Sequence, residues 1–443
     1  GEPTPFVGLV WDESPAFVAA FLGLASSGWA VGVLDGRWTG AEADGALDVL
    51  APSAVMVPAA HPWEPRAGHR PAAAPAGWRA WSTPAASGPA GPRTPGAGDA
   101  FYVGFTSGSA GRPKAFQRSH RSWWESFAGL DAFAPLGDGP VVVPGGMGSS
   151  HFLFGALHAL HAGATLELRP APDAARAGAD EAPAAMYVVP TMLAHAAARG
   201  SLGTPAPRRV YCAGARLEAA VRAAVRDAFP GTEVVEYYGA SELSFVAIRR
   251  DGDDTPPGSV GRAFPGVEIE VRGDDGVPAA AGERGTLHVR SPLVFMGYRG
   301  GAPAGAPARP ADGWITVGDR GRVDAAGHVW VDGRGSALII TGAANVQPEE
   351  VEEVVSTAPG VASCVVVGVD DPAWGQVVCA AVEPAQGAAL TRAALRAHVA
   401  GRLSAYKRPR RYVALDGPPP LGRTGKVDRA AVRALVDGAA EIR

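Results

Sequence analysis

The sequence predicts an α/β protein with a large N-terminal domain, residues 1–333, and a small α+β C-terminal domain, residues 334–443. Residues 5–35 alternate strand, helix and strand, which is typical of a parallel sheet. From 258 to 332 the pattern changes to short alternating strands with glycine turns, which predicts a small β-barrel-like part or a distorted antiparallel sheet. The large domain is therefore expected to combine parallel and mixed sheets with helices.

The first strand–helix–strand unit is the clearest local pattern. Residues 6–11 and 31–34 are short apolar runs, and residues 16–26 between them are apolar and helix-forming. A Ser-Pro pair precedes this helix, and both residue types are typical of a helix start. Residues 58–99 are rich in proline, alanine and glycine, so we expect an irregular surface excursion there.

Apolar runs and helix-forming stretches place the other expected elements. In the large domain these are strands at 100–106, 141–143, 186–189, 209–212, 234–238, 267–271, 286–289 and 328–331, with helices at 152–162 and 217–229. In the small domain they are helices at 348–356 and 392–403 and strands at 365–369 and 377–382.

The bulk composition excludes several classes of protein. Hydrophobic residues make up 47% of the chain, so large cores can be buried, and a net charge of −4 argues against general nucleic-acid binding. No apolar run reaches the roughly 18 residues that a membrane span needs. No basic region followed by an apolar stretch marks a signal peptide. We therefore expect a cytoplasmic protein that has no membrane span and binds no nucleic acid.

Cysteines and histidines do not form a recognisable metal site. Cys212, Cys364 and Cys379 are far apart and odd in number, so we expect small buried hydrophobic residues rather than a disulfide framework. His158 and His161 share one side of an expected helix, but no carboxylate or cysteine nearby completes a set of ligands.

Lysine is nearly absent from the chain. Lys114, Lys407 and Lys426 are the three lysines, and the other 37 of the 40 basic residues are arginine. A lysine that persists in such a composition is expected where the planar fork of arginine cannot replace a compact ammonium. Two of the three lie in glycine-rich segments, 106–114 and 422–426, and such segments with a point charge favour phosphate binding. Lys407 keeps two open interpretations, a surface lysine and a functional one.

The 106–114 segment differs from a Walker loop. That motif needs a Gly-Lys-Ser/Thr sequence that opens a helix, whereas Lys114 is preceded by Pro113 and followed by Ala115. The usual route of kinases and GTPases is therefore disfavoured. A different phosphate-binding family is needed to explain the segment.

The string at 105–114, Phe-Thr-Ser-Gly-Ser-Ala-Gly-Arg-Pro-Lys, with Ser119-His120 just beyond, resembles the phosphate loop of the adenylate-forming superfamily. Its members include acyl- and aryl-CoA ligases, the adenylation domains of peptide synthetases, and luciferases. Further segments resemble the superfamily's signatures in the same order along the chain. They lie at 238–242, 313–319, 333–334, 345–352, 406–409 and 425–429.

The resemblance implies a two-step reaction with ATP, Mg²⁺ and CoA. A carboxylate attacks the α-phosphate of ATP to form an acyl-adenylate and pyrophosphate, and a thiol then displaces AMP. Two anions must meet in the first step, so cations and fixed dipoles have to cancel their repulsion. The expected partners are a small-molecule carboxylic acid and CoA, or a carrier-protein thiol in place of CoA.

The resemblance also assigns roles to individual residues. Lys426, Glu242 and Lys114 are the expected catalytic residues; Lys426 bridges the carboxylate and the α-phosphate, and Glu242 helps hold Mg²⁺. Tyr238 packs on adenine, Asp319 and Arg334 hold the ribose hydroxyls, and Ser241 touches phosphate. The other expected nucleotide-binding residues are Thr106, Ser107, Gly108, Ser109, Gly111, Gly214 and Gly239.

The acid pocket is expected to draw on two regions of the sequence. The segment 144–151 lacks the aspartate with which amino-acid-activating domains hold an α-amino group, so an acyl or aryl acid is expected rather than an α-amino acid. The expected pocket residues are Ser150, His151, Phe152, Ala213 and Ala240.

Two departures from the superfamily pattern concern the second step. Ser336 stands where the superfamily commonly has an Asp or Lys hinge, and the resemblance implies that this hinge makes the small C-terminal domain mobile. Ala343 stands where many CoA ligases carry a second glycine that lines the pantetheine tunnel. An extra methyl there narrows the tunnel, so two acceptors stay open besides CoA: a carrier-protein thiol and an amine. A nucleotide-binding pseudoenzyme is disfavoured by the retained charged residues.

Overall fold

The computed structural model describes residues 4–84, 93–106, 113–169, 181–203, 205–217, 219–301, 312–334, 338–342, 344–420 and 427–442. Contacts divide these residues into two compact units. The first contains residues up to 36, residues 49–105, and the described residues from 115 to 334. The second contains residues 37–48, Thr106, Pro113, Lys114 and the described residues from 338 onward. A domain boundary at 333/334 stays a prediction, because short segments from the first part of the chain group with the second unit.

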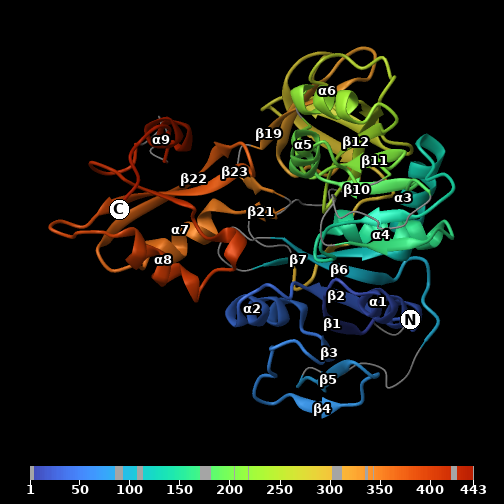
Figure 1. The fold of residues 1–443 in the computed structure, drawn as a ribbon, viewed down its shortest axis with the longest axis horizontal. Coiled ribbons are helices and arrows are strands. Elements are labelled where there is room, and N and C mark those ends of the chain that lie inside the picture. The colour runs from blue at the N-terminus through green and yellow to red at the C-terminus, as the bar shows by residue number, and fades with distance from the viewer. Residues whose placement is uncertain are drawn as a thin grey trace. The chain divides into compact units, whose positions relative to one another are not determined.

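The first unit begins with the expected βαβ arrangement. β1 (Phe6–Val10) pairs in parallel with β2 (Ala30–Leu34), and α1 (Pro15–Ser26) connects them (Figure 1). The Ser14 hydroxyl accepts a hydrogen bond from the Phe17 amide at 3.3 Å, which satisfies one free donor of the first helical turn.

These strands belong to an eight-stranded sheet with the order β17-β7-β6-β2-β1-β3-β5-β4. The other members are β3 (Ala54–Pro58), β4 (Arg70–Ala72), β5 (Trp78–Ser82), β6 (Ala100–Thr106), β7 (Lys114–Ser119) and β17 (Gly297–Tyr298). The expectation of an irregular excursion at 58–99 is wrong for β4 and β5, since β5 pairs antiparallel with β3. Ala80 and Trp81 are buried there, so the apolar contribution of this strand outweighs the proline- and glycine-rich composition around it.

A second, seven-stranded sheet has the order β14-β13-β12-β11-β10-β8-β9. Its strands are β8 (Val141–Val143), β9 (Leu166–Leu168), β10 (Ala185–Val188), β11 (Arg209–Cys212), β12 (Glu233–Ala240), β13 (Ser244–Arg250) and β14 (Arg262–Ala263), and the helices α5 (Pro190–Arg199) and α6 (Ala219–Ala228) accompany them. β8 to β12 run parallel to their neighbours, whereas β13 and β14 are antiparallel. β12 continues two residues beyond its expected end, with a bulge between Tyr238 and Gly239.

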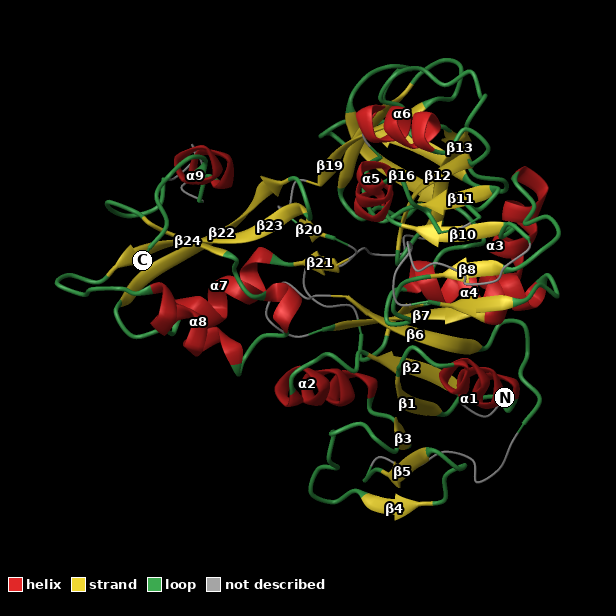
Figure 2. Cartoon of the chain, viewed as in Figure 1, coloured by secondary structure: helices red, strands yellow, loops and turns green. Residues whose placement is uncertain are grey.

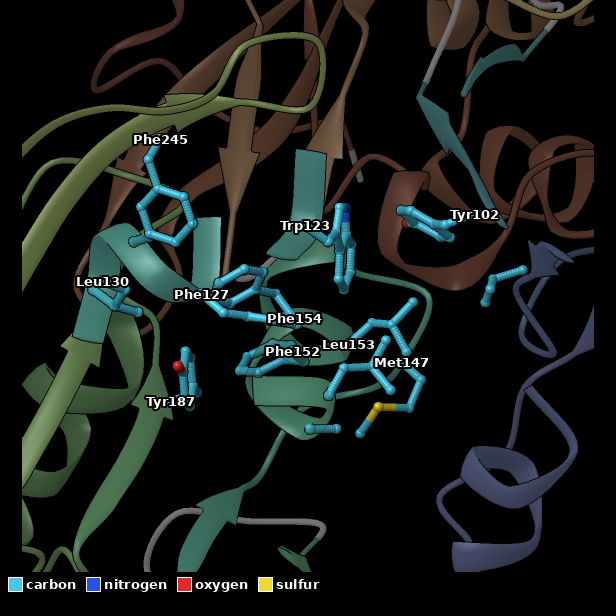
Figure 3. Packing of buried hydrophobic residues seen from close by; sticks show 14 of the residues in the cluster. Tyr102, Trp123, Phe127, Leu130, Met147, Phe152, Leu153, Phe154, Tyr187 and Phe245 are labelled. Carbon is cyan, nitrogen blue, oxygen red and sulfur yellow. The ribbon is translucent and has the colours of Figure 1, made fainter. Parts of the chain in front are cut away.

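One aromatic core joins the two sheets through the helices α3 (His120–Phe133) and α4 (Ser150–His161). Figure 3 shows Trp123 and Phe127 of α3 close to Phe154 of α4, and the Phe127 and Phe154 ring centroids are 4.9 Å apart. Tyr102 of the first sheet lies in the same cluster. Because aromatic side chains bury large areas, this cluster is the main apolar contact between the two sheets.

The glycine-rich region after 258 forms an antiparallel sheet. β15 (Glu268–Arg272), β16 (Gly285–Arg290), β18 (Asp319–Val323) and β19 (Val329–Arg334) follow the spatial order β15-β16-β18-β19. Of the two expected forms, the distorted antiparallel sheet describes these four strands. β18 starts at Asp319, which places this expected site residue at a strand end.

The second unit is built on a five-stranded sheet covered on both faces. Its strands are β20 (Ile339–Thr341), β21 (Ala344–Val346), β22 (Val361–Asp371), β23 (Gly375–Pro384) and β24 (Arg411–Ala414), and its helices are α2 (Gly40–Leu50, of which residues 40–48 group with this unit), α7 (Pro348–Ser356), α8 (Arg392–Ala400), the 3₁₀ turn Ala405–Lys407 and α9 (Arg429–Val436). Val366 and Val378 pack with α7 and α8, whereas Val365 and Val377 pack with α9. This alternation follows from the two-residue period of a strand, and Figure 2 shows α8 and α9 on opposite sides of the sheet.

Lys407 is buried, which excludes the surface interpretation. Its ammonium lies 2.8 Å from Glu42 Oε1 and 2.6 Å from Glu350 Oε1, and its side chain is 8% exposed. Burial raises the pKa of Glu350, and the charge of Lys407 offsets this only in part. Burial also opposes ionisation of Glu42, but Lys407 and the donors of Thr39 and Ser404 lower its pKa. One ammonium group therefore forms ion pairs with two buried carboxylates within the second unit.

The cysteines are buried or partly buried, and His158 is hydrogen-bonded to neighbouring side chains. Cys212 and Cys379 are fully buried in apolar clusters, and Cys364 is partly buried. His158 is hydrogen-bonded to the Tyr187 hydroxyl at 2.6 Å and to Asp131 at 2.9 Å. None of the helices in the described part of the chain is both long and apolar enough to cross a bilayer.

Candidate active site

Tyr238 and Asp319 meet although they are 81 residues apart. The Tyr238 hydroxyl donates a hydrogen bond to Asp319 Oδ2. Tyr238 lies near the end of β12, and Asp319, 5% exposed, is the first residue of β18. Two expected adenosine-binding residues from two different sheets are therefore brought together.

Arg334 and Gly239 extend this group. Arg334 is opposite Asp319 in the register of β18 and β19, which places its backbone beside the expected ribose residue. Gly239 follows Tyr238 at the β12 bulge, and a Cβ added there would lie 2.1 Å from the Ser244 carbonyl oxygen. Glycine is thus required for the turn that leads into Ala240, Ser241 and Glu242.

Glu242 is the buried carboxylate of this turn. It is 8% exposed, its Oε1 accepts a hydrogen bond from the Tyr298 hydroxyl at 2.7 Å, and its carbonyl accepts one from the Phe295 amide at 2.8 Å. Among the described residues, neither a hydrogen bond nor an ion pair engages its Oε2. Mg²⁺ at nucleotide sites is commonly held by one or two carboxylates together with substrate phosphates, so a single available carboxylate oxygen fits this ion.

The sequence did not identify Tyr298 as part of the site. It lies 56 residues from Glu242, in a short strand whose only local signal is the Gly-Tyr pair at 297–298. Hydrogen bonding across that separation depends on the pairing of β17 with β7. The hydrogen bond between Tyr298 and Glu242 therefore could not be predicted from the sequence.

The two glycine-rich segments are described only in part. Thr106 is the last residue of β6 and Lys114 is the first of β7. Ser107, Gly108, Ser109, Gly111 and Lys426 lie outside the described residues, as do Ser336 and Ala343, and the side chain of Arg334 is likewise not described. The roles of these residues stay predictions. Gly214, also expected near the nucleotide, has φ +93°, a conformation that favours glycine.

Two of the expected pocket residues have close partners within the first unit, and their place in an acid pocket stays a prediction. Phe152 is 1% exposed and packs in the aromatic core (Figure 3). Both ring nitrogens of His151 are engaged, Nδ1 with the Tyr237 hydroxyl at 2.5 Å and Nε2 with the Val188 carbonyl at 2.9 Å. Burial lowers the pKa of His151 to about 4, so the ring is neutral at pH 7 and offers no charge to an acid.

The other expected pocket residues are buried or partly buried, and their role in the pocket also stays a prediction. Ser150 is the partly buried first residue of α4, and Ala240 is partly buried at the end of β12. Ala213 is 5% exposed and directly follows β11. Each comes from the seven-stranded sheet or from α4, which packs against it.

Replacing Asp319 with alanine should raise the KM for ATP about 10- to 100-fold, because hydrogen bonds to a charged acceptor contribute about 1.5–3 kcal/mol. The measurement is pyrophosphate release as a function of ATP concentration. Asp274→Ala is the matched control. This exposed carboxylate pairs with Arg320, the neighbour of Asp319 on β18, and its removal should leave the KM for ATP unchanged. An unchanged KM in a folded Asp319→Ala variant would exclude a ribose contact.

The chain is similar to known protein families and proteins along most of its length. The family model of the AMP-binding enzymes matches residues 2–299, and that of their C-terminal domain matches residues 350–426. The chain is 35% identical over 435 residues to an uncharacterized acyl-CoA ligase, YhfT, of Bacillus subtilis strain 168, covering 96% of this chain and 87% of that protein. It is 32% identical over 362 residues to an indoleacetate-CoA ligase of Aromatoleum aromaticum, covering 78% and 68%.

Solved structures show the same two-domain fold. The amide bond synthetase McbA from Marinactinospora thermotolerans superimposes with a TM-score of 0.79 at 26% identity, covering 98% of this chain and 91% of that chain. The ordered motifs, the Tyr238–Asp319 contact and the two matching family models describe one kind of enzyme. The chain belongs to the family of AMP-binding enzymes, the adenylate-forming superfamily that includes the acyl-CoA ligases.

Proposed function

We propose that this protein activates an acyl or aryl carboxylic acid with ATP and transfers it to the thiol of CoA. In the first step a carboxylate oxygen bonds to the α-phosphorus and pyrophosphate leaves. In the second step the CoA sulfur bonds to the acyl carbon, AMP leaves, and the thiol proton is released to solvent. The products are an acyl-CoA, AMP and pyrophosphate.

The contact between Tyr238 and Asp319 is the observation that carries the proposal. It supports an adenosine site in which Tyr238 supplies an aromatic face and Asp319 accepts from the ribose hydroxyls. Glu242, in the turn that follows Tyr238, would hold Mg²⁺, which neutralises phosphate charge when bound. Lys114 and Lys426 would supply the remaining positive charge toward the phosphates and the reacting carboxylate.

The class of acid is inferred from the described residues at the expected pocket. The neutral His151 provides no cation near the expected pocket, and Ala213 and Ala240 contribute small apolar surfaces. These features favour an uncharged acyl or aryl chain over a substrate with a second charge. The relative named for indoleacetate makes arylacetic acids a sensible first choice.

The three cysteine thiols, none in a disulfide, fit a cytoplasmic location.

The test is acid-dependent release of pyrophosphate with a panel of carboxylic acids that includes indoleacetate, a short acyl acid and an α-amino acid. We expect release with at least one acyl or aryl acid and an acyl-CoA product by mass spectrometry. Parallel reactions with a carrier protein or an amine in place of CoA identify the acceptor. A folded protein that binds ATP but releases no pyrophosphate with any acid would refute the proposal.

A further inference from the structure

The hydrogen bond between Tyr298 and Glu242 joins the two large sheets of the first unit. Glu242 lies in the turn between β12 and β13 of the seven-stranded sheet. Tyr298 lies on β17, at the edge of the eight-stranded sheet. The orientation of the Glu242 carboxylate therefore depends on a residue that the other sheet positions.

The segment 295–299 is anchored along β7 by its backbone. The Met296 amide donates to the Gln117 carbonyl and the Arg299 amide donates to the Ala115 carbonyl, each at 2.8 Å. β17 pairs antiparallel with β7, so that Tyr298 is opposite Phe116. Since these contacts involve main-chain atoms, the sheet fixes the backbone from which the Tyr298 ring projects.

The same segment is also hydrogen-bonded to the turn that contains Glu242. The Phe295 amide donates to the Glu242 carbonyl at 2.8 Å, and the Phe295 and Tyr298 rings pack edge to face with centroids 5.0 Å apart. On its other side the turn ends at Ser244, which has φ +63° and lies within 3.3 Å, Oγ to Oγ, of Ser126 on α3. A residue with positive φ other than glycine persists when its surroundings hold it. The turn is thus held from both sides.

We propose that Tyr298 is a positioning residue for Mg²⁺·ATP, acting through Glu242. This inference rests on the proposed function, in which Glu242 is the carboxylate that holds the metal. The phenol donates to Oε1 and restricts rotation of the carboxylate, which leaves Oε2 directed for the ion. Without the phenol, a carboxylate that is 8% exposed loses its donor and its fixed orientation.

The test compares the binding of ATP with excess Mg²⁺ and in EDTA, measured by calorimetry, for the wild type and three variants. Tyr298→Phe should weaken Mg²⁺·ATP binding about tenfold while changing metal-free ATP binding less than about twofold. Glu242→Gln should show the same selective loss. The matched control is Tyr211→Phe, which removes another buried phenol, one that donates to the Ala134 carbonyl at 2.5 Å. This control should keep the wild-type difference between the two conditions.

The outcomes separate this inference from the proposed function. If Tyr298→Phe weakens both forms of ATP equally, or neither, the positioning role is wrong. If ATP binding by Glu242→Gln depends on Mg²⁺ as strongly as in the wild type, both the assignment of Glu242 to the metal and this inference are wrong. Both are also wrong if ATP binding by the wild type does not depend on Mg²⁺. If the wild type shows Mg²⁺-dependent binding, lost in Tyr298→Phe, but releases no pyrophosphate with any acid, the inference stands and the ligase proposal fails.

Discussion

Replacement of Lys426 with alanine should lower acid-dependent pyrophosphate release about 100- to 1,000-fold, the loss typical when a preorganised charge is removed from a transition state. The physical reason is the meeting of two anions, the substrate carboxylate and the α-phosphate. A lysine between them cancels their repulsion, and no other lysine lies within the segment 422–426. The measurement is the initial rate of pyrophosphate release at saturating acid and ATP, with folding checked by thermal denaturation.

Two further variants make this experiment specific. Lys426→Arg retains the charge but replaces a compact ammonium by a planar fork, so it should stay well below the wild-type rate. Arg433→Ala removes another C-terminal cation, an exposed arginine of α9 that pairs with the exposed Asp370, and should leave the rate unchanged. A Lys426→Ala variant with a rate within threefold of the wild type would contradict the role assigned to this lysine.

Replacement of Lys407 with methionine should reduce the free energy of unfolding by about 3–5 kcal/mol, as expected when one member of a buried ion cluster is removed. Glu42 and Glu350, with side chains 11% and 9% exposed, would then lie buried without their shared cation. Urea unfolding followed by tryptophan fluorescence measures the loss. Tryptophan suits this purpose because Trp38 contacts Tyr406 beside the cluster, with its Nε1 3.4 Å from the Tyr406 hydroxyl.

The loss caused by Lys407→Met should depend on pH. Burial already raises the pKa of Glu350, and removal of the lysine would raise it further. A carboxyl whose folded-state pKa is raised costs stability as pH rises through the window above its unfolded pKa, near 4.3. The destabilisation should therefore be larger at pH 8 than at pH 5. An equal loss at both pH values would mean that the carboxylates are not the cause.

Two control variants separate charge from packing at Lys407. The double variant Lys407→Met/Glu350→Gln removes one of the two stranded charges and should recover part of the lost stability. Arg402→Met replaces an exposed cation that donates to the His398 carbonyl, and such surface changes stay within about 0.5 kcal/mol. If Lys407→Met itself costs less than this, the cluster does not stabilise the second unit.

Much of the fold follows from local patterns. The βαβ unit at the N-terminus, β6, β11 and α7 match their expected positions within one or two residues, because each combines an apolar run with a clear start or stop signal. The excursion at 58–99 was misjudged because β4 and β5 gain their stability from pairing with each other and with β3. Pairing partners at that separation leave little trace in local composition.

In the candidate site, too, some features could be predicted from the sequence and others could not. Tyr238, Glu242 and Asp319 were identified from ordered motifs, and the contact between Tyr238 and Asp319 agrees with that grouping. The contacts of Phe152 and His151 could not be predicted in this way: Phe152 packs against Gly145, and His151 is hydrogen-bonded to Tyr237 and Val188. Neighbours of this kind come from other strands and cannot be read from adjacent residues.

By itself the sequence determined the adenylate-forming family and the alternation of strands and helices, and it predicted which residues contact a nucleotide, because these depend on short motifs and on periodicity. Only the tertiary structure decided that Lys407 is buried between Glu42 and Glu350 and that Tyr298 holds Glu242. The physical reason is that hydrogen bonds and ion pairs require atoms within about 3 Å, and the sheet pairings and helix packing bring such distant residues that close.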